Sequence, residues 1–218
     1  MSRNNNSTTN NFEIEVHGRP GQAPCEVMQC FKKGLENYCQ EKYEDAIEFF
    51  DKALKLDPAY SNALNNKGIV LRNLGKQEEA LDCFDRAIVI NPDDKFALNG
   101  KGNILNDLKR YGEAITYFDR AYNTDKNDKE ALINKGFSLF NLKRYQDAIE
   151  CYDKALQIDQ YDKEALNNKG YSFQMLGKYR EALECFDEAL LVDSSDRDSL
   201  NGKGLALRSL NRFHEAIE

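Results

Sequence analysis

The sequence predicts an all-α protein, a solenoid of helix-turn-helix repeats, and three observations point to this fold class. Leu, Ala, Lys, Glu and Asp are abundant and only 4 of the 218 residues are Pro, a composition that favours helix over sheet. Glycine recurs at a fixed interval of 34 residues. Within each interval, apolar residues fall at helical spacing in two separate stripes, as expected for a pair of helices.

The interval is carried by four series of small and aromatic residues. Since all keep one period without an insertion, the chain is an array of similar units. The glycines are Gly34, Gly68, Gly102, Gly136, Gly170 and Gly204. One alanine series is Ala46, Ala80, Ala114, Ala148, Ala182 and Ala216, and the other is Ala53, Ala87, Ala121, Ala155 and Ala189. The aromatic series is Phe50, Phe84, Phe118, Tyr152 and Phe186.

The second unit shows how each pair of helices is delimited. Its apolar stripes cover residues 64–74 and 80–88, and the Gly75-Lys76 pair between them suits a tight turn. Pro92 follows the second stripe, where it disfavours continuing the helix and favours starting the next one. Later units replace this Pro with other residues but keep an Asp-rich polar turn.

The small residues predict close packing between helices. Glycine inside a helix costs about 1 kcal/mol relative to alanine, so the repeated glycines indicate that a neighbouring helix approaches closely. We expect the periodic alanines to face these glycines. The aromatic residues would then fill the space between successive helix pairs, since neither pair can bury its apolar face alone.

These residues resemble the tetratricopeptide repeat (TPR) family, whose 34-residue unit pairs two antiparallel helices, A and B, in a right-handed solenoid. With Gly at unit position 8, the units cover residues 27–60, 61–94, 95–128, 129–162 and 163–196, and a partial unit covers 197–218. Residues 1–26 are expected to form a disordered polar tail. The array ends inside a unit, so we expect a fragment of something longer, with self-association through its exposed C-terminal end.

One departure from the family pattern is the lysine at unit position 7, often an apolar site in the family. It is present in all six units, as Lys33, Lys67, Lys101, Lys135, Lys169 and Lys203. We expect the aliphatic stems to cover the apolar seam while the ammonium groups reach water.

Charge and hydropathy argue against nucleic-acid and membrane partners. The formal net charge is −7, with no long basic run, and such a surface repels phosphate backbones. No stretch of about 18 apolar residues is present to span a membrane. The first residues lack the layout of a secretory signal. We therefore expect a cytoplasmic protein.

No pattern in the sequence predicts catalysis, a metal or a cofactor. Cys83, Cys151 and Cys185 occupy one unit position, which predicts packed sites on the B helices rather than reactive thiols. There is no C-x-x-C pair, and His17 and His214 lie far apart. Metalloprotease, serine-hydrolase and phosphate-loop motifs are missing. We expect no enzyme, no cofactor and no metal site.

Asparagine at unit position 5 or 6 is the first candidate for function. It recurs in every unit from the second onward, although Asn is a mediocre helix former. A carboxamide can pair with the N–H and C=O groups of any peptide. The series resembles the asparagine-lined groove of the TPR array of O-GlcNAc transferase, which grips peptide backbone. Alternatively, these residues cap loops or bond neighbouring helices. The series is Asn65, Asn66, Asn99, Asn134, Asn167, Asn168 and Asn201, with Asn103 one turn further along.

Aromatic residues at unit position 9 are the second candidate. Phe137 and Tyr171 come from adjacent units and should lie side by side, with Ile133 and Phe140 flanking Phe137. Aromatic pockets are frequent binding hot spots, and the alternative is that these rings pack between A helices. Unit position 2 is acidic in the last three units. That would repel a C-terminal carboxylate, as chaperone tails would present to related arrays.

The sequence therefore predicts a scaffold that binds a protein or an extended peptide in a concave groove lined by the A helices. Two alternatives of other classes remain open. One is a regulatory or targeting arm of a larger enzyme, and the other is a structural scaffold that self-assembles through its ends.

Overall fold

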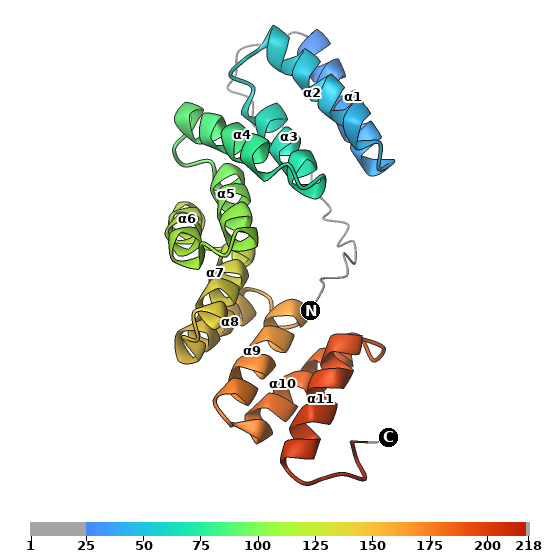
Figure 1. The fold of residues 1–218 in the computed structure, drawn as a ribbon, viewed down its shortest axis with the longest axis vertical. Coiled ribbons are helices and arrows are strands. Elements are labelled where there is room, and N and C mark those ends of the chain that lie inside the picture. The colour runs from blue at the N-terminus through green and yellow to red at the C-terminus, as the bar shows by residue number, and fades with distance from the viewer. Residues whose placement is uncertain (1–24, 217–218) are drawn as a thin grey trace.

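The computed structural model describes residues 25–216, which form eleven α-helices in chain order (Figure 1). The predicted tail of residues 1–26 lies almost wholly outside this range. The A helices of successive units are α1 (Cys25–Cys39), α3 (Ser61–Asn73), α5 (Lys95–Asp107), α7 (Lys129–Asn141), α9 (Lys163–Met175) and α11 (Arg197–Ser209). The B helices are α2 (Tyr43–Leu56), α4 (Gln77–Ile90), α6 (Tyr111–Thr124), α8 (Tyr145–Ile158) and α10 (Tyr179–Val192).

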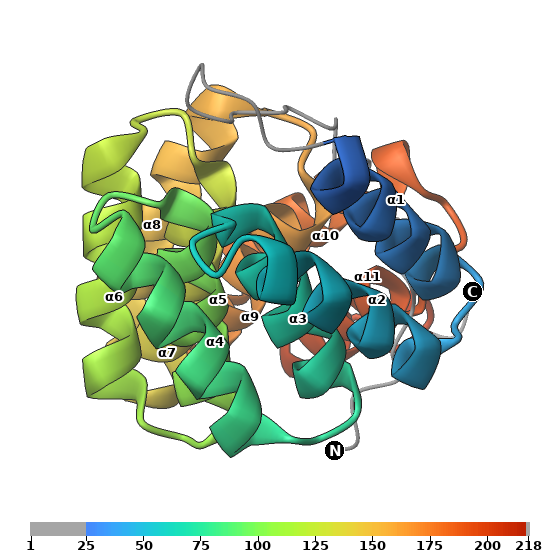
Figure 2. The ribbon, with the colours of Figure 1, turned by 90° about the horizontal axis from the view of Figure 1, so that it is seen from above.

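The helix pairs stack into a right-handed solenoid, which confirms the predicted fold class. Each helix packs against the next one in the chain, and each A helix also packs against the A helix of the following unit. Among the described residues, no two B helices come as close. Because the A helices are the nearer neighbours, they form the inner, concave side. Figure 2 shows this curvature, with α6 and α8 at the outer edge and α5 and α9 nearer the middle.

The glycines face aromatic rings, so the prediction that they face alanines is wrong. A Cβ built on Gly102 would lie 2.5 Å from Phe118 Cε1, and one on Gly136 would lie 2.5 Å from Tyr152 Cε1. The same contact joins glycine and aromatic ring in each of the first five units. The ring comes from the B helix of the same unit, and the missing Cβ lets it lie against the A-helix backbone. The alanines are fully buried elsewhere in the core.

Two kinds of local contact set the ends of the A helices. The residue at unit position 15, in every A-to-B turn, has a left-handed backbone, with φ of 75° at Gly75 but also 61° at Lys143. At the other end, α5, α7, α9 and α11 each begin after an aspartate whose side chain accepts a hydrogen bond from the first-turn backbone. Such caps satisfy donors that a helix start leaves unpaired. The polar Asp-rich turns thus start the next A helix.

The position 7 lysines are ion-paired, which corrects the expectation that their ammonium groups reach water. Lys135 Nζ lies 2.5 Å from Asp119 Oδ1, and Lys169 Nζ lies 2.7 Å from Asp153 Oδ1. Lys67, Lys101 and Lys203 form the same pair with the B helix of the unit before. Each lysine therefore joins two units rather than solvating a seam.

The cysteines match their predicted places on the B helices. Cys83, Cys151 and Cys185 are buried, and burial raises the pKa of the Cys83 thiol to about 11 and that of Cys185 to about 12. A thiol that stays protonated is a poor nucleophile. In the sixth unit, residues 211–216 form turns instead of helix.

Candidate functional site: the inner face of the A helices

The candidate site is the inner face of α5, α7, α9 and α11, because the predicted site residues from Asn99 to Asn201 lie on these helices. The predicted residues fall into three groups with different surroundings. These are the asparagines of unit position 5, those of position 6, and the side chains of position 9.

The position 5 asparagines of the second, third and fifth units are buried and hold the next A helix. The Nδ2 atoms of Asn65, Asn99 and Asn167 donate to Asp94, Asp128 and Asp196 over 2.9, 2.7 and 3.0 Å. These aspartates are the N-caps of α5, α7 and α11. The asparagines are only 4 to 8% exposed. Since their donors are used inside the array, we leave them out of the contact surface proposed below.

The position 6 asparagines are more accessible. Asn66, Asn134 and Asn168 are half-buried. The Asn66 amide donates to the carbonyl of Asn62, one turn back in α3. The backbone carbonyls of Asn134 and Asn168 accept from Ser138 and Ser172. Asn201, at position 5 of the last unit, is exposed.

Position 9 of one unit meets position 2 of the next, and we call each such contact a rung. The Asn103 side chain of α5 forms a hydrogen bond with the Glu130 carboxylate of α7. The Tyr171 hydroxyl of α9 donates to the Asp198 carbonyl of α11 over 2.8 Å. The same register pairs Phe137 with Glu164 between them. The rungs thus run along the inner face from α5 to α11.

The aromatic side chains are partly engaged inside the array. Tyr171 is half-buried, and its ring lies edge-on to Phe186 with centroids 5.1 Å apart. Phe137 is half-buried on the same face. The predicted flanking residues belong to the core instead, since Ile133 is 5% exposed and Phe140 lies edge-on to Tyr145 at 5.3 Å. The rung residues therefore form the accessible part of this set.

Carboxylates dominate the electrostatics of this face. Burial raises the pKa of Glu130, and the nearby charges of Asp128 and Glu164 raise it further. Arg72 opposes this shift, but it already forms an ion pair with Asp107, with Nε–Oδ2 at 2.6 Å. Sequence reasoning used the acidic position 2 residues only to exclude a carboxylate ligand. It missed that they pair with position 9, although both series share one period.

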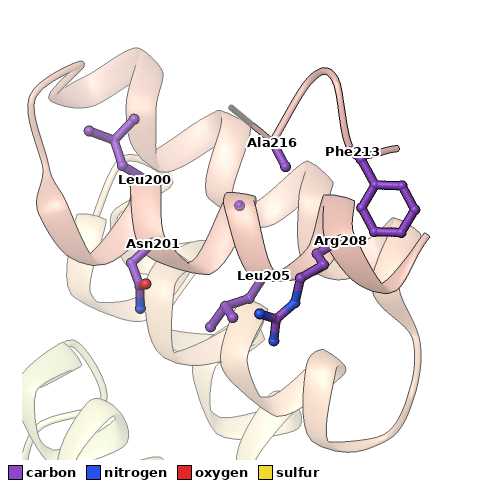
Figure 3. A pocket seen from close by; sticks show the side chains of 7 residues that line it. Leu200, Asn201, Leu205, Arg208, Phe213 and Ala216 are labelled. Atoms are coloured by element: carbon purple, nitrogen blue, oxygen red, sulfur yellow. The ribbon is translucent and has the colours of Figure 1, made fainter. Parts of the chain in front are cut away.

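A shallow hollow of about 420 Å³ lies at the C-terminal end of the inner face (Figure 3). Leu200, Leu205, Arg208, Phe213 and Ala216 are among its lining residues. It opens beside Gly204, where a Cβ would meet only the Ala216 carbonyl, at 4.0 Å. No aromatic ring from a B helix covers this glycine among the residues that the structure describes.

Comparison with known proteins identifies the repeat. Models of the tetratricopeptide repeat match residues 28–60, 61–94, 97–128, 130–162 and 164–196. The chain belongs to the tetratricopeptide repeat family. Repeats of this family generally mediate protein–protein interactions. As an all-helical interaction module, this array has no helix within residues 25–216 that is long and apolar enough to cross a membrane.

Solved TPR structures share the fold at low sequence identity. PilW, a widely conserved type IV pilus biogenesis factor, matches with a TM-score of 0.83 and 21% identity, covering 89% of this chain and 91% of that one. PilF of Pseudomonas aeruginosa matches with 0.79 and 18%, covering 88% and 86%. YrrB, a TPR protein with an unusual peptide-binding site, matches with 0.65 and 24%, covering 81% and 91%. At these identities the likeness shows the fold alone.

A curated sequence relative covers a shorter part of the chain. "Uncharacterized protein MJ0572" of Methanocaldococcus jannaschii is 44% identical over 46 residues, which are 21% of this chain and 54% of that protein. The match thus spans about half the length of that relative. It supports the repeat and carries no information on a partner.

Proposed function

We propose that this TPR chain is a protein-binding scaffold that holds an extended segment of another protein along the inner face of α5, α7, α9 and α11. The observation that carries the proposal is the row of rungs. Each rung presents a polar or aromatic side chain from one A helix beside a carboxylate from the next. A repeated, solvent-facing arrangement of this kind suits a ligand that is itself periodic, such as an extended chain.

Seven of the predicted residues remain in the proposed contact surface. The position 6 amides can pair with peptide N–H and C=O groups, while Phe137 and Tyr171 supply apolar contact. The retained residues are Asn66, Asn103, Asn134, Phe137, Asn168, Tyr171 and Asn201. YrrB, which has an unusual peptide-binding site, offers a precedent within the same fold. No cofactor or metal is needed for such binding.

The test compares the inner face with the outer face. Peptides are selected on the intact chain from a display library, and their affinities are measured for the wild type and two variants. Phe137→Ala removes an inner-face ring. Leu191→Ala is the matched control, because Leu191 lies on α10 and is 86% exposed. We expect Phe137→Ala to weaken binding about tenfold, as truncation of an aromatic anchor does, and Leu191→Ala to leave it unchanged.

A second measurement guards against a folding defect. Asn201 is exposed, so Asn201→Ala removes an inner-face amide with little effect on packing. Hydrogen exchange of the complex should show protection on α7 and α9 and none on α8 and α10. Protection confined to the B helices, or loss of binding only with Leu191→Ala, would refute an inner-face site.

A further inference from the structure

The chemistry of the inner face changes along the array. Unit position 2 is uncharged in the first three units, as Met28, Asn62 and Phe96, and acidic in the last three, as Glu130, Glu164 and Asp198. All three acidic side chains are exposed. They sit on successive A helices and, as the rungs show, on one face. The half of the groove from α7 to α11 therefore carries a row of negative charge.

Lysines at the starts of α7 and α9 do not neutralise this row. Lys129 Nζ lies 2.6 Å from Asp159 and 2.7 Å from Asp162. In the next unit, Lys163 forms the equivalent pair of contacts with the aspartates at positions 31 and 34, at 2.9 and 2.8 Å. Both lysines thus face the loop that follows their own unit, away from the acidic row.

Arginines alter the balance only at the two ends. Arg72 is held by the bidentate pair with Asp107. At the C-terminal end, α11 carries Arg197 and Arg208, which offset the charge near Asp198. The negative character is therefore strongest at Glu130 and Glu164. The raised pKa of Glu130, caused by burial and by Asp128 and Glu164, agrees with carboxylates crowded in a partly enclosed place.

Aromatic rings stand beside this row. The rungs bring Phe137 next to Glu164, and Tyr171 next to Asp198. Phe96, which is 47% exposed, occupies position 2 just before Glu130. Carboxylates with adjacent aromatic faces suit ammonium and guanidinium groups, because the cation gains both ion pairing and attraction to the ring. Such a site disfavours acidic segments.

The spacing of the units limits the spacing of the ligand's charges. Packed helices lie about 8 to 10 Å apart, and an extended chain advances about 3.3 Å per residue. Three residues of the ligand therefore span one unit. We infer that the inner face from α7 to α11 selects an extended protein segment that carries Lys or Arg at every third residue, with apolar residues between them. This inference rests on the proposed groove function.

The test uses three capped 12-residue peptides that share one apolar sequence. Every third residue is Lys in the basic peptide, Gln in the neutral one and Glu in the acidic one. Titration calorimetry on the intact chain gives their affinities at 50 and 300 mM salt. We expect the basic peptide to bind at least tenfold more tightly than the neutral one and to lose most of that advantage at high salt. The acidic peptide should bind weakest.

Charge-neutralising variants locate the effect. Glu130→Gln with Glu164→Gln should reduce affinity for the basic peptide about tenfold and leave the neutral peptide unchanged. The matched control is Glu150→Gln with Glu184→Gln, since both residues are exposed on the outer B helices α8 and α10. This control should change nothing. A larger loss in the control than in the inner-face variant would overturn the inference.

The failure of the inference can be told from failure of the groove function. If all three peptides bind equally and protect α7 and α9 from exchange, the groove binds segments but does not select for positive charge. If display-selected peptides map to the inner face without enrichment in Lys or Arg, the inference also fails while the function stands. If none of the three designed peptides binds, the charge pattern is insufficient and the inference is wrong.

Discussion

A glycine-to-alanine pair of variants tests the packing argument most directly, because the structure predicts opposite signs for the same chemical change. Gly102 lies inside α5, where an added Cβ would be 2.5 Å from Phe118 Cε1 and 2.7 Å from its Cζ. Gly112 lies in the first turn of α6, and nothing is within 4 Å of an added Cβ. Neither backbone has a positive φ, so sterics and helix propensity decide the outcome.

The magnitudes follow from these contacts. In both helices, alanine gains about 0.5 to 1 kcal/mol over glycine in backbone entropy and solvation. At Gly112 nothing opposes this gain, so the variant should be more stable. At Gly102 the ring must move, and Phe118 is fully buried. Overpacking of a buried site costs about 1 to 3 kcal/mol. The net effect of Gly102→Ala should therefore be a loss of about 1 to 2 kcal/mol.

Urea unfolding followed by circular dichroism measures both free energies. Because the units of a solenoid can unfold separately, hydrogen exchange should confirm that the loss is centred on α5 and α6. A double variant, Gly102→Ala with Phe118→Leu, should recover part of the loss beyond the sum of the single changes. The reasoning fails if Gly102→Ala is as stable as the wild type, or if Gly112→Ala is less stable.

Three further outcomes are expected. Lys143 has a left-handed backbone with φ of 61°, so Lys143→Gly should stabilise the chain by about 1 kcal/mol, and a loss in urea unfolding would contradict this. Hydrogen bonding to Lys163 lowers the pKa of Asp193, so that pair stabilises the fold above the ordinary carboxyl pKa and less as pH falls through the lowered one. Lys163→Met should be less stable than the wild type at pH 7 and nearly equal at pH 2, as unfolding at both pH values would show. In mass-resolved alkylation, exposed Cys39 should react at once and buried Cys185 only on unfolding; equal rates would contradict its burial.

The period made the fold predictable, and the partner of each periodic residue was harder to predict. Series at one interval determine the number and length of the units, since each unit must present the same face to its neighbours. They do not say which series touches which. The glycines at position 8 were expected to face alanines but contact the aromatic rings. The position 7 lysines were expected to reach water but pair with aspartates 16 residues earlier. Both errors concern contacts across helices, which spacing alone leaves open.

The candidate site was predictable as a face and less so as a set of residues. Placing function on the A helices follows from the resemblance to the family. The choice among asparagines depends on burial, which the residue type does not reveal. Asn99 and Asn103 lie one turn apart on α5, yet Asn99 is 7% exposed and bonds Asp128, whereas Asn103 is half-buried and bonds Glu130. One turn of helix separates a residue that builds the array from one placed to meet a ligand.

The first unit indicates why asparagine recurs at position 5. There the same two positions hold Phe31 and Tyr60, whose rings meet edge-on at 5.2 Å. Asn99 and Asp128 occupy the equivalent places and meet through a hydrogen bond of 2.7 Å. A nonpolar pair and a polar pair therefore perform one task, which is to join an A helix to the start of the next. The contact between the two positions is what the repeat requires, and a peptide ligand is not needed to explain the asparagines there. The inner-face argument consequently rests on the rungs, where the chemistry varies from unit to unit in a way that packing between units does not require.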